Sequence, residues 1–570
     1  MFDADPYAGV DWELFRTAAT LLHGYERPVQ DEQVRSLAPP GALTGYWFGS
    51  YYNRDYSEPK MRWHPWHALL NGFNSAWWWT ADIAYSTWPD AFAPDLTPLD
   101  PFKWTMEEVR EIKSGVGRLL LDSRREHDGI ALLYSMPSYL ANAAYPLRRE
   151  RLGLEGREPA FMETRYSWQM LLEDLGLQYQ YVSEGDIARG ALDTGEYRVM
   201  ILPASQAITA ETARALEGFV RGGGLLLADI WPAVVDQWCN PLEEGLLDDV
   251  FGVRRSWVGA EDRRKRPVRF RLPDGSDVEL PHRCVDHTLH AAVGGPRGEA
   301  CGIPFVVENR LGRGRALLLN FYVGDYYTSW HFREETHADL RFGRWGGVLR
   351  ALLRGVLEES DVRARVSVSS EGRALLGCEP VFFSRGGSRY LALEYKPDII
   401  YFVNGDIRVI LDRYEYDIHP DVSPRPLHVG LRDRSHVYDL REGRYLGFAS
   451  ELESEIAPGE AKVFSLLPYR VAALTLEAPR RVRRGEVAHL DVDVAVEASE
   501  GEPGRHCFHL DAVNPDGEMV RHYAQNALGD EGRAALQVPF ARNDPCGTWR
   551  LIVRDVSTGI TAEAPVQLHD

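Results

Sequence analysis

The chain lacks the features that define several common protein classes. Its 570 residues include only six cysteines and no Cys-x-x-Cys pair, which argues against a disulfide scaffold and a structural zinc site. No apolar run approaches the roughly 20 residues that span a bilayer. Lys and Arg number 64 against 84 Asp and Glu, a net charge of −20 that disfavours nucleic acid and anionic membranes as partners. We therefore expect no membrane, nucleic-acid or metal partner.

The first residues also lack a secretion signal. Met1-Phe-Asp-Ala-Asp-Pro-Tyr7 has neither a basic segment nor an apolar one, so a cytoplasmic location is predicted. The same stretch reads like the interior of a domain, a strand end followed by a loop and a helix. We therefore expect the chain to be part of a longer protein.

The composition is that of a folded, multidomain protein. Hydrophobic residues make up 44% and charged residues 26% of the chain, which excludes wholesale disorder. A chain of this length predicts about three to five domains. Shifts in the pattern of apolar residues place the boundaries near residues 125, 360 and 469, which gives four segments, 1–125, 126–360, 361–469 and 470–570.

The first segment, 1–125, alternates helices with strands and holds nine of the 16 tryptophans. Asp11 is suited to cap a helix that runs to Leu22. Further predicted elements are a strand at 41–48, a helix opened by Glu58-Pro59, a strand at 74–80 and a helix at 105–121. Such β/α alternation is typical of parallel sheets and barrels.

The second segment, 126–360, predicts a doubly wound α/β domain. Strands are predicted at 130–134, 178–182, 199–203 and 225–228. Helices are predicted at 161–175 and after Thr209, which is suited to cap one. A nucleophile elbow would place Ser or Cys just after a strand, but 225–228 is followed by Asp229-Ile-Trp-Pro232. We therefore expect a structural or assembly role.

Two other motifs of the second segment are weak. The run Gly222-Gly-Gly224 precedes a strand instead of joining a strand to a helix, so it fails the context test for a phosphate loop. A nearby polar group could suggest a metal site, but its irregular spacing favours an ordinary loop; its members are His282, Cys284, Asp286 and His287.

The third and fourth segments, 361–469 and 470–570, read as β-sandwiches. Val487 to Val494 alternates apolar and polar residues, and Asn514-Pro-Asp-Gly517 is a turn signal between strands. Cys507 and Cys546 lie in the fourth segment and could form a disulfide in an exported protein; the alternative is two buried thiols.

Aromatic residues form the first candidate site. Trp77 and Trp79 face one side of a predicted strand, and their indole rings could stack on sugar rings at the mouth of a barrel. Trp47, Tyr52 and Asp82 could complete such a substrate-binding surface. The alternative for each tryptophan is packing in the core.

Carboxylates form the second candidate site, because glycoside hydrolysis normally uses two of them. The acids near loops of the first segment are Asp31, Glu32, Asp55, Glu58 and Asp82. Each can instead be a solvated or helix-capping acid, and Glu58 suits a helix start. Spacing alone does not select a pair.

The order of these parts resembles glycoside hydrolase family 42, which contains β-galactosidases. The stretch from Arg62 to Trp79 resembles the seventh helix and eighth strand of that family's (β/α)8 barrel, and Glu107 to Leu121 the helix that closes it. The second segment is similar to the family's trimerisation domain, an amidotransferase-like fold without its cysteine. The resemblance implies a carbohydrate substrate, a homotrimer, no cofactor, and a fold of a partial barrel, an α/β domain and two sandwiches.

The sequence departs from that family at the catalytic positions. It contains no Asn-Glu dipeptide for the acid/base glutamate, and the place equivalent to the nucleophile reads Phe48-Gly-Ser-Tyr51. The nearest acids, Asp55 and Glu58, are the predicted catalytic residues. We expect a retaining β-galactosidase-like hydrolase whose activity needs the full-length protein, this chain being truncated and inactive alone. The alternative is a non-catalytic carbohydrate-binding or oligomerisation scaffold.

Overall fold

The computed structural model divides the chain into two compact units. The first comprises Met1–Trp47, His127–Ala364 and Asp398–Ile418, and the second Phe48–Glu126, Arg365–Pro397 and His419–Asp570. The structure describes residues 11–24, 28–48, 58–78, 91–93, 95–145, 160–256, 266–282, 286–321, 323, 326, 341, 343–396, 423–497 and 501–570.

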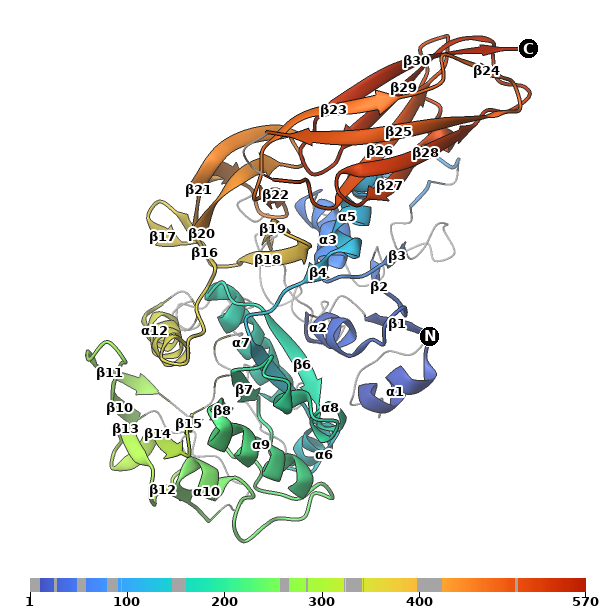
Figure 1. The fold of residues 1–570 in the computed structure, drawn as a ribbon. Coiled ribbons are helices and arrows are strands. Elements are labelled where there is room, and N and C mark those ends of the chain that lie inside the picture. The colour runs from blue at the N-terminus through green and yellow to red at the C-terminus, as the bar shows by residue number, and fades with distance from the viewer. Residues whose placement is uncertain are drawn as a thin grey trace. The chain divides into compact units, whose positions relative to one another are not determined.

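Five neighbouring parallel strands form the centre of the first unit (Figure 1). In spatial order they are β15 (Gly314–Leu319), β8 (Leu225–Asp229), β7 (Val199–Leu202), β5 (Ile130–Tyr134) and β6 (Tyr179–Ser183). Every residue of β5, β7 and β8 is buried, as expected for strands that have helices on both faces. The predicted strands of this segment are confirmed.

The same sheet continues beyond β15 as an antiparallel extension. Its strands are β14 (Ile303–Leu311), β13 (Gly295–Ala300), β10 (Arg266–Arg271) and β11 (Asp277–His282). A separate two-stranded pair consists of β9 (Val253–Arg254) and β12 (His290–Ala291).

Helices of the first unit begin and end at recognisable signals. The side chain of Thr209 caps α9 (Ala210–Gly222), and Gly223 ends it in the left-handed region at a φ of 119°, as the sequence predicted. The other helices are α6 (Met136–Ala144), α7 (Ala160–Asp174), α8 (Glu184–Ala188), the 3₁₀ turn Ala191–Asp193, α10 (Asp248–Phe251) and α12 (Arg344–Glu358).

The first helix of the chain is shorter than predicted. Asp11 caps α1 (Trp12–Ala18) as expected, but the helix ends before Leu22. Residues 21–24 instead form β1 (Leu21–Gly24), which pairs in parallel with β2 (Leu43–Phe48), with α2 (Pro28–Leu37) between them. Pairing with a distant strand thus overrides the helical spacing of these leucines.

The second unit begins with helices and one short strand. These are α3 (Glu58–Leu70), β3 (Ser75–Trp78), α4 (Asp100–Glu111), a π-helical segment (Ile112–Val116) and α5 (Gly117–Asp122). The predicted helix at 105–121 is therefore interrupted. Gly115 has a φ of 117°, and a Cβ at this position would overlap the side chain of Val556. Only glycine fits both requirements.

Antiparallel strands of the third segment, together with a two-residue strand at 124–125, hydrogen-bond into one sheet, where the sequence predicted a sandwich. One face packs against α3 and α5 through Trp66, Leu70, Leu120, Phe383 and Tyr390. The strands are β4 (Arg124–Arg125), β16 (Val366–Ser370), β17 (Arg373–Ala374), β18 (Cys378–Arg385), β19 (Ser388–Tyr395), β20 (Arg425–Asp439), β21 (Arg444–Ile456) and β22 (Ala461–Leu467).

The last hundred residues form two sheets around one hydrophobic core that includes Trp549. One sheet contains β23 (Val471–Glu477), β25 (Val487–Val496) and β28 (Arg533–Pro539). The other contains β24 (Arg481–Arg483), β26 (His506–Val513), β27 (Gln525–Gly529), β29 (Gly547–Asp555) and β30 (Thr561–His569), with a 3₁₀ turn at Arg521–Tyr523.

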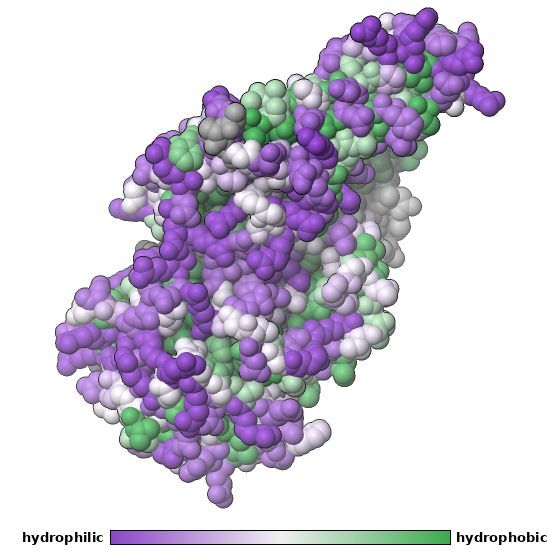
Figure 2. All heavy atoms as spheres, in the orientation of Figure 1, coloured by the Kyte–Doolittle hydropathy of each residue, from purple (hydrophilic) through white to green (hydrophobic). Residues whose placement is uncertain are grey.

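Two cysteines of this last region are free thiols. Cys507 is buried, but Cys546 is exposed, so the prediction of two buried thiols is right only for Cys507. Hydrophilic side chains are spread over the visible surface, with hydrophobic ones scattered among them (Figure 2). Within the described residues, no helix combines the length and apolar character that crossing a membrane requires.

Candidate functional site

Glu58, the predicted catalytic glutamate, lies in the first turn of α3 and is exposed. Its carboxylate accepts a hydrogen bond from Arg62 Nε at 2.7 Å. The same guanidinium donates to Glu107 at 2.8 Å and to Glu108 at 2.9 Å. Partial burial lowers the pKa of Arg62, but the hydrogen bonds to the three glutamates outweigh it and raise the pKa overall. Arg62 thus ties α3 to α4, and Glu58 pairs with it within α3.

The ion-pair network continues away from Glu58. Glu108 Oε2 accepts hydrogen bonds from Trp66 Nε1 and from Arg441, both at 2.8 Å. Arg441 also pairs with Glu111 at 2.7 Å, and its guanidinium lies over the Trp66 ring at 4.7 Å. This network has the geometry of a structural clamp between helices and the turn after β20. A catalytic role for Glu58 stays a prediction.

The tryptophans of β3 are half-buried and face opposite sides. The Trp78 ring packs edge-on against Phe102 of α4, with a centroid distance of 5.4 Å. Trp77 therefore points to the other side of the strand, and its role in sugar binding stays a prediction. Of the other predicted site residues, only the backbone of Trp47, in β2, is described; Tyr52, Asp55, Trp79 and Asp82 lie outside the described residues.

A buried histidine–glutamate pair joins α3 to β19, and the sequence did not reveal it. His67 Nδ1 lies 2.7 Å from Glu394 Oε1, and both side chains are almost fully buried. The Trp63 ring stacks on His67 at a centroid distance of 4.3 Å. Spacing shows that Trp63 and His67 share a helix face, but their partner is 327 residues away.

The carboxyl ends of β7 and β8 meet at a strained, buried corner of the first unit. Asp229, the last residue of β8, accepts a hydrogen bond from Ala204 N at 2.6 Å, and burial raises its pKa to about 7. Ala204, Trp231 and Ala233 adopt positive φ angles of 44°, 62° and 55°. Strained residues of this kind often mark functional turns.

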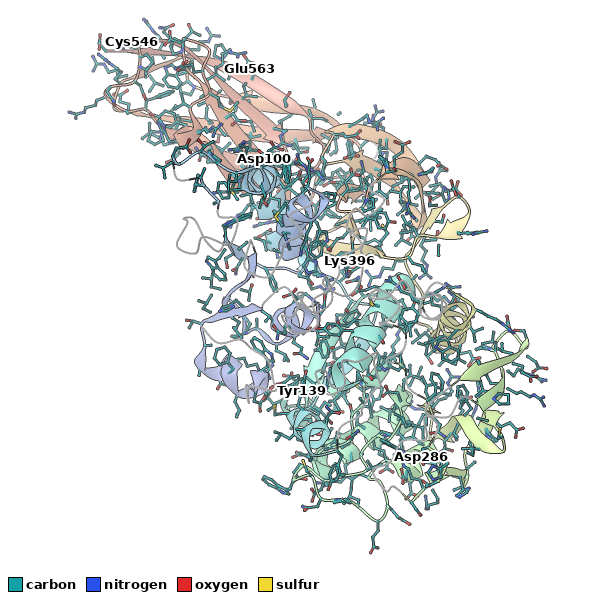
Figure 3. The ribbon with its side chains drawn as sticks, turned by 180° about the vertical axis from the view of Figure 1, so that it is seen from behind. Asp100, Tyr139, Asp286, Lys396, Cys546 and Glu563 are labelled. Carbon is teal, nitrogen blue, oxygen red and sulfur yellow. The ribbon has the colours of Figure 1, made fainter. Side chains whose placement is uncertain are left out.

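The turn after β8 nevertheless holds no nucleophile, as the sequence predicted. The indole of Trp231 is buried and donates from Nε1 to Asp286 Oδ2 at 3.0 Å; Asp286 is labelled in Figure 3. Asp286 also accepts from Thr288 Oγ1 at 2.7 Å. The carboxylate of Asp286 thus acts as a hydrogen-bond acceptor for the side chains of Trp231 and Thr288. In the part of the chain that the structure describes, no group of His, Cys, Asp and Glu residues is arranged to hold a metal.

A second polar cluster lies at the carboxyl ends of β5 and β6. The carboxylate of Glu184 accepts hydrogen bonds from Ser135 Oγ at 2.6 Å, Thr209 N at 2.9 Å and Thr212 Oγ1 at 2.8 Å. Ser135 Oγ is also within 2.9 Å of the carbonyl oxygen of Ala207. These groups satisfy one another and fix the starts of two helices, which suits a structural role.

The glycine run borders a cavity of about 920 Å³ at the amino ends of β8 and β15. Five arginines line it, but Arg313 donates to the Gly222 carbonyl at 2.8 Å, and Arg315 pairs with Glu308 and Glu359. Ligands of doubly wound sheets bind at the carboxyl ends of the strands. The position of the cavity therefore gives no support to a phosphate-binding role for the glycine run Gly222–Gly224.

Comparison with known proteins identifies the middle of the chain. Residues 180–337 match the family model of the β-galactosidase trimerisation domain. No curated protein sequence matches the chain.

Solved structures of β-galactosidases resemble most of the chain. The enzyme from Bacillus circulans sp. alkalophilus aligns with a TM-score of 0.59 and 14% identity, covering 81% of this chain and 62% of that one. A catalytic mutant of Gan42B, a GH42 β-galactosidase from G. stearothermophilus, aligns with a TM-score of 0.57 and 14% identity, covering 80% of this chain and 61% of that one. The cold-adapted enzyme from Rahnella sp. R3 aligns with a TM-score of 0.51 and 14% identity, covering 76% of this chain and 56% of that one.

These matches confirm the resemblance to glycoside hydrolase family 42. The family model covers the α/β region, and the solved structures show that the fold of most of the chain is that of β-galactosidases of this family. The chain spans about three fifths of the length of the first two structures.

Proposed function

We propose that this chain is the C-terminal part of a β-galactosidase-like glycoside hydrolase. In the complete protein, a terminal galactoside is cleaved with retention of configuration by two carboxylates. The observation that carries the proposal is the trimerisation-domain match at 180–337, in a chain whose fold aligns over 81% with a β-galactosidase. Because the chain spans 62% of that enzyme, the activity is proposed for the complete protein.

The proposed architecture assigns a role to each segment. Residues 1–125 form the last part of a (β/α)8 barrel, and the parallel pairing of β1 with β2 around α2 supports this. Residues 126–360 form the amidotransferase-like assembly domain of a homotrimer. Residues 361–469 and 470–570 are accessory β-domains. No cofactor is required, and a cytoplasmic location stays a prediction.

In this proposal Trp77 provides a stacking surface for the galactose ring. Trp78 packs against Phe102, so alternation along β3 leaves the half-buried Trp77 for the other face. Trp47, Tyr52, Trp79 and Asp82 are proposed to complete the subsite, and Asp55 and Glu58 are proposed as its carboxylates. The Arg62 pair of Glu58 favours a structural role, so we expect the chain alone to bind galactose without cleaving galactosides.

Calorimetric titration of the purified chain with galactose tests this proposal. We expect saturable binding that Trp77→Ala weakens about tenfold, because the substitution removes the aromatic contact. Trp104→Ala is the matched control, since Trp104 is also a half-buried tryptophan of the second unit. Absence of galactose binding, or equal losses in both variants, would overturn the assignment of Trp77.

A non-catalytic carbohydrate-binding or oligomerisation scaffold is the second candidate. One observation favours it, namely that the place equivalent to the family's nucleophile reads Phe48-Gly-Ser-Tyr51. The enzyme and the carbohydrate-binding form of the scaffold both predict galactose binding by this chain. They differ in the complete protein, which hydrolyses an aryl β-galactoside only if the enzyme proposal is correct.

A further inference from the structure

The most exposed tryptophan of the described residues stands on a rigid loop of the first unit. Trp238 is 77% exposed, although large aromatic side chains are usually buried. Asp236 Oδ1 accepts hydrogen bonds from Trp238 N at 2.9 Å and Asn240 N at 2.8 Å, and Asp236 N donates to the Asn240 carbonyl at 3.0 Å. These hydrogen bonds hold the backbone of the turn that carries the exposed indole.

Helix α6 exposes an apolar face beside this loop. Its sequence, Met136–Ala144, contains no charged residue. Leu140 is 50% exposed, and Ala143 and Ala144, three and four residues later, lie on the same face and are exposed too. The opposite face is buried through residues such as Tyr139, which Figure 3 labels.

Two contacts place the loop next to the end of α6. Tyr145, which follows the helix, donates from Oη to the Cys239 carbonyl at 3.3 Å. Ser138 Oγ donates to the Ala207 carbonyl, and Ala207 pairs with Val235 in a parallel β-bridge just before the loop. We call the resulting patch the α6 surface; it consists of Leu140, Ala143, Ala144, Tyr145 and Trp238.

The α6 surface carries no charge, although the chain as a whole is strongly acidic. Two copies with a net charge of −20 repel each other over most orientations. The α6 surface has no charged side chain, and the neighbouring Asp236 uses its carboxylate inside its own turn. Among the described residues of this surface, a second copy would meet no unpaired charge, whose burial is a common cost of association.

The size of the patch suits the centre of a larger contact. One fully buried tryptophan contributes on the order of 200 Å², whereas a stable interface needs about 800 Å² from each partner. The α6 surface is therefore the apolar centre, and a polar rim would supply the rest. Tryptophan is enriched among the residues that dominate binding energy at such centres.

We propose that the α6 surface packs against a neighbouring copy of this chain in the homo-oligomer, with Trp238 as its anchor. Trp238 lies within the region that matches a trimerisation domain. The inference rests on the proposed function for the oligomeric state and adds the surface that forms it. In a closed ring of three, the surface would meet a different face of the next copy.

Light scattering after size exclusion measures the mass of the purified chain and tests this proposal. We expect the wild type to have three times the 64.5 kDa chain mass, and Trp238→Ser and Leu140→Glu to shift it to the single-chain mass. Met519→Ser is the matched control, because Met519 is 55% exposed but lies in the C-terminal sandwich. Both substituted side chains are exposed, so unchanged circular dichroism spectra are expected.

The outcomes separate the surface from the assembly. A wild-type oligomer that both variants leave intact would overturn the α6 surface but keep the proposed trimer. A wild type that is monomeric at every concentration would overturn both. Galactose binding does not depend on either outcome, so a failed surface is distinguishable from a failed glycosidase proposal.

Discussion

Asp229 in the first unit and Asp555 in the second are equally buried but differ in their hydrogen-bond partners. Both side chains are completely inaccessible to solvent. Asp555 accepts from His506 Nδ1 at 2.9 Å, Ser557 N at 3.2 Å and Thr558 Oγ1 at 2.5 Å. Asp229 accepts from Ala204 N, and its pKa is raised to about 7 because burial disfavours its charge. The two equally buried carboxylates therefore differ in how many donors reach them.

The two strand ends explain this difference. Asp229 ends a central parallel strand, where the following residues, including Trp231, turn away to other partners. Asp555 ends an antiparallel strand, and the tight turn after it returns Ser557 and Thr558 to its own carboxylate. A turn that folds back on its strand can thus supply the donors that a buried carboxyl group needs.

The largest expected effect comes from removing the well-partnered carboxylate. Asp555→Ala should lower the free energy of unfolding by about 3–5 kcal/mol, because it leaves three buried groups, His506 Nδ1, Ser557 N and Thr558 Oγ1, without their common partner. Urea denaturation followed by circular dichroism measures the loss. Thr558→Val is the matched control and should cost only about 1–2 kcal/mol, since it removes one hydrogen bond. Equal costs for the two variants would show that the His506 pair adds nothing.

The effect at Asp229 should depend on pH instead. A raised pKa means that the unfolded chain releases this proton first, so stability is lost as pH rises from about 4 to about 7. Asp229→Asn abolishes that loss, and its advantage over the wild type should grow by about 2–3 kcal/mol between pH 5 and pH 8. Urea midpoints at the two pH values measure the change.

Asp274→Asn is the matched control for this pH experiment. Asp274 is exposed, and the hydrogen bonds from Ser276 lower its pKa, so it does not titrate between pH 5 and pH 8. An advantage of Asp229→Asn that is independent of pH would contradict the raised pKa of Asp229.

A smaller effect is expected at the neighbouring buried carboxylate, Asp286. Trp231→Phe removes the hydrogen bond from the indole and should destabilise the chain by about 1–2 kcal/mol. Val293→Ala is the control, since that side chain is exposed and the substitution should change stability by no more than about 0.5 kcal/mol. A neutral Trp231→Phe would indicate that Asp286 does not need this donor.

Glu58 is an exposed carboxylate and provides the contrast to the buried ones. Glu58→Gln removes one of the three ion pairs of Arg62 and should cost less than about 1 kcal/mol, because solvent screens exposed charges. Glu107→Gln removes a similarly exposed pair of the same arginine and should behave alike. A loss above about 2 kcal/mol for Glu58 alone would contradict a simple surface pair.

The sequence predicts the α/β region well because its strands are continuous apolar runs between helix caps. Residues 130–134 are a strand in both the prediction and the structure. Local patterns succeed where burial is two-sided and the cap is a side chain such as Thr209. They fail at Leu22, where pairing of β1 with β2 decides, and at Gly115, where contact with Val556 interrupts a helix.

The candidate site was less predictable because it depends on distant partners. An Arg62 four residues after Glu58 is visible in the sequence, but Glu108 and Arg441, which extend the network, come from other elements. Likewise, nothing near Asp229 distinguishes it from a solvated aspartate until the sheet buries it. Spacing reports local contacts, whereas the ionisation of a carboxylate depends on groups that only the fold brings close.

The turnover of 4-nitrophenyl β-galactoside by the purified chain tests most directly the claim that it carries the sugar-binding but not the cleaving part of a glycosidase. We predict no release of nitrophenolate above the uncatalysed rate, although galactose binds. Turnover at the 1–10³ s⁻¹ typical of enzymes that disappears in Glu58→Gln would contradict the account, because it would show a complete catalytic site in this chain.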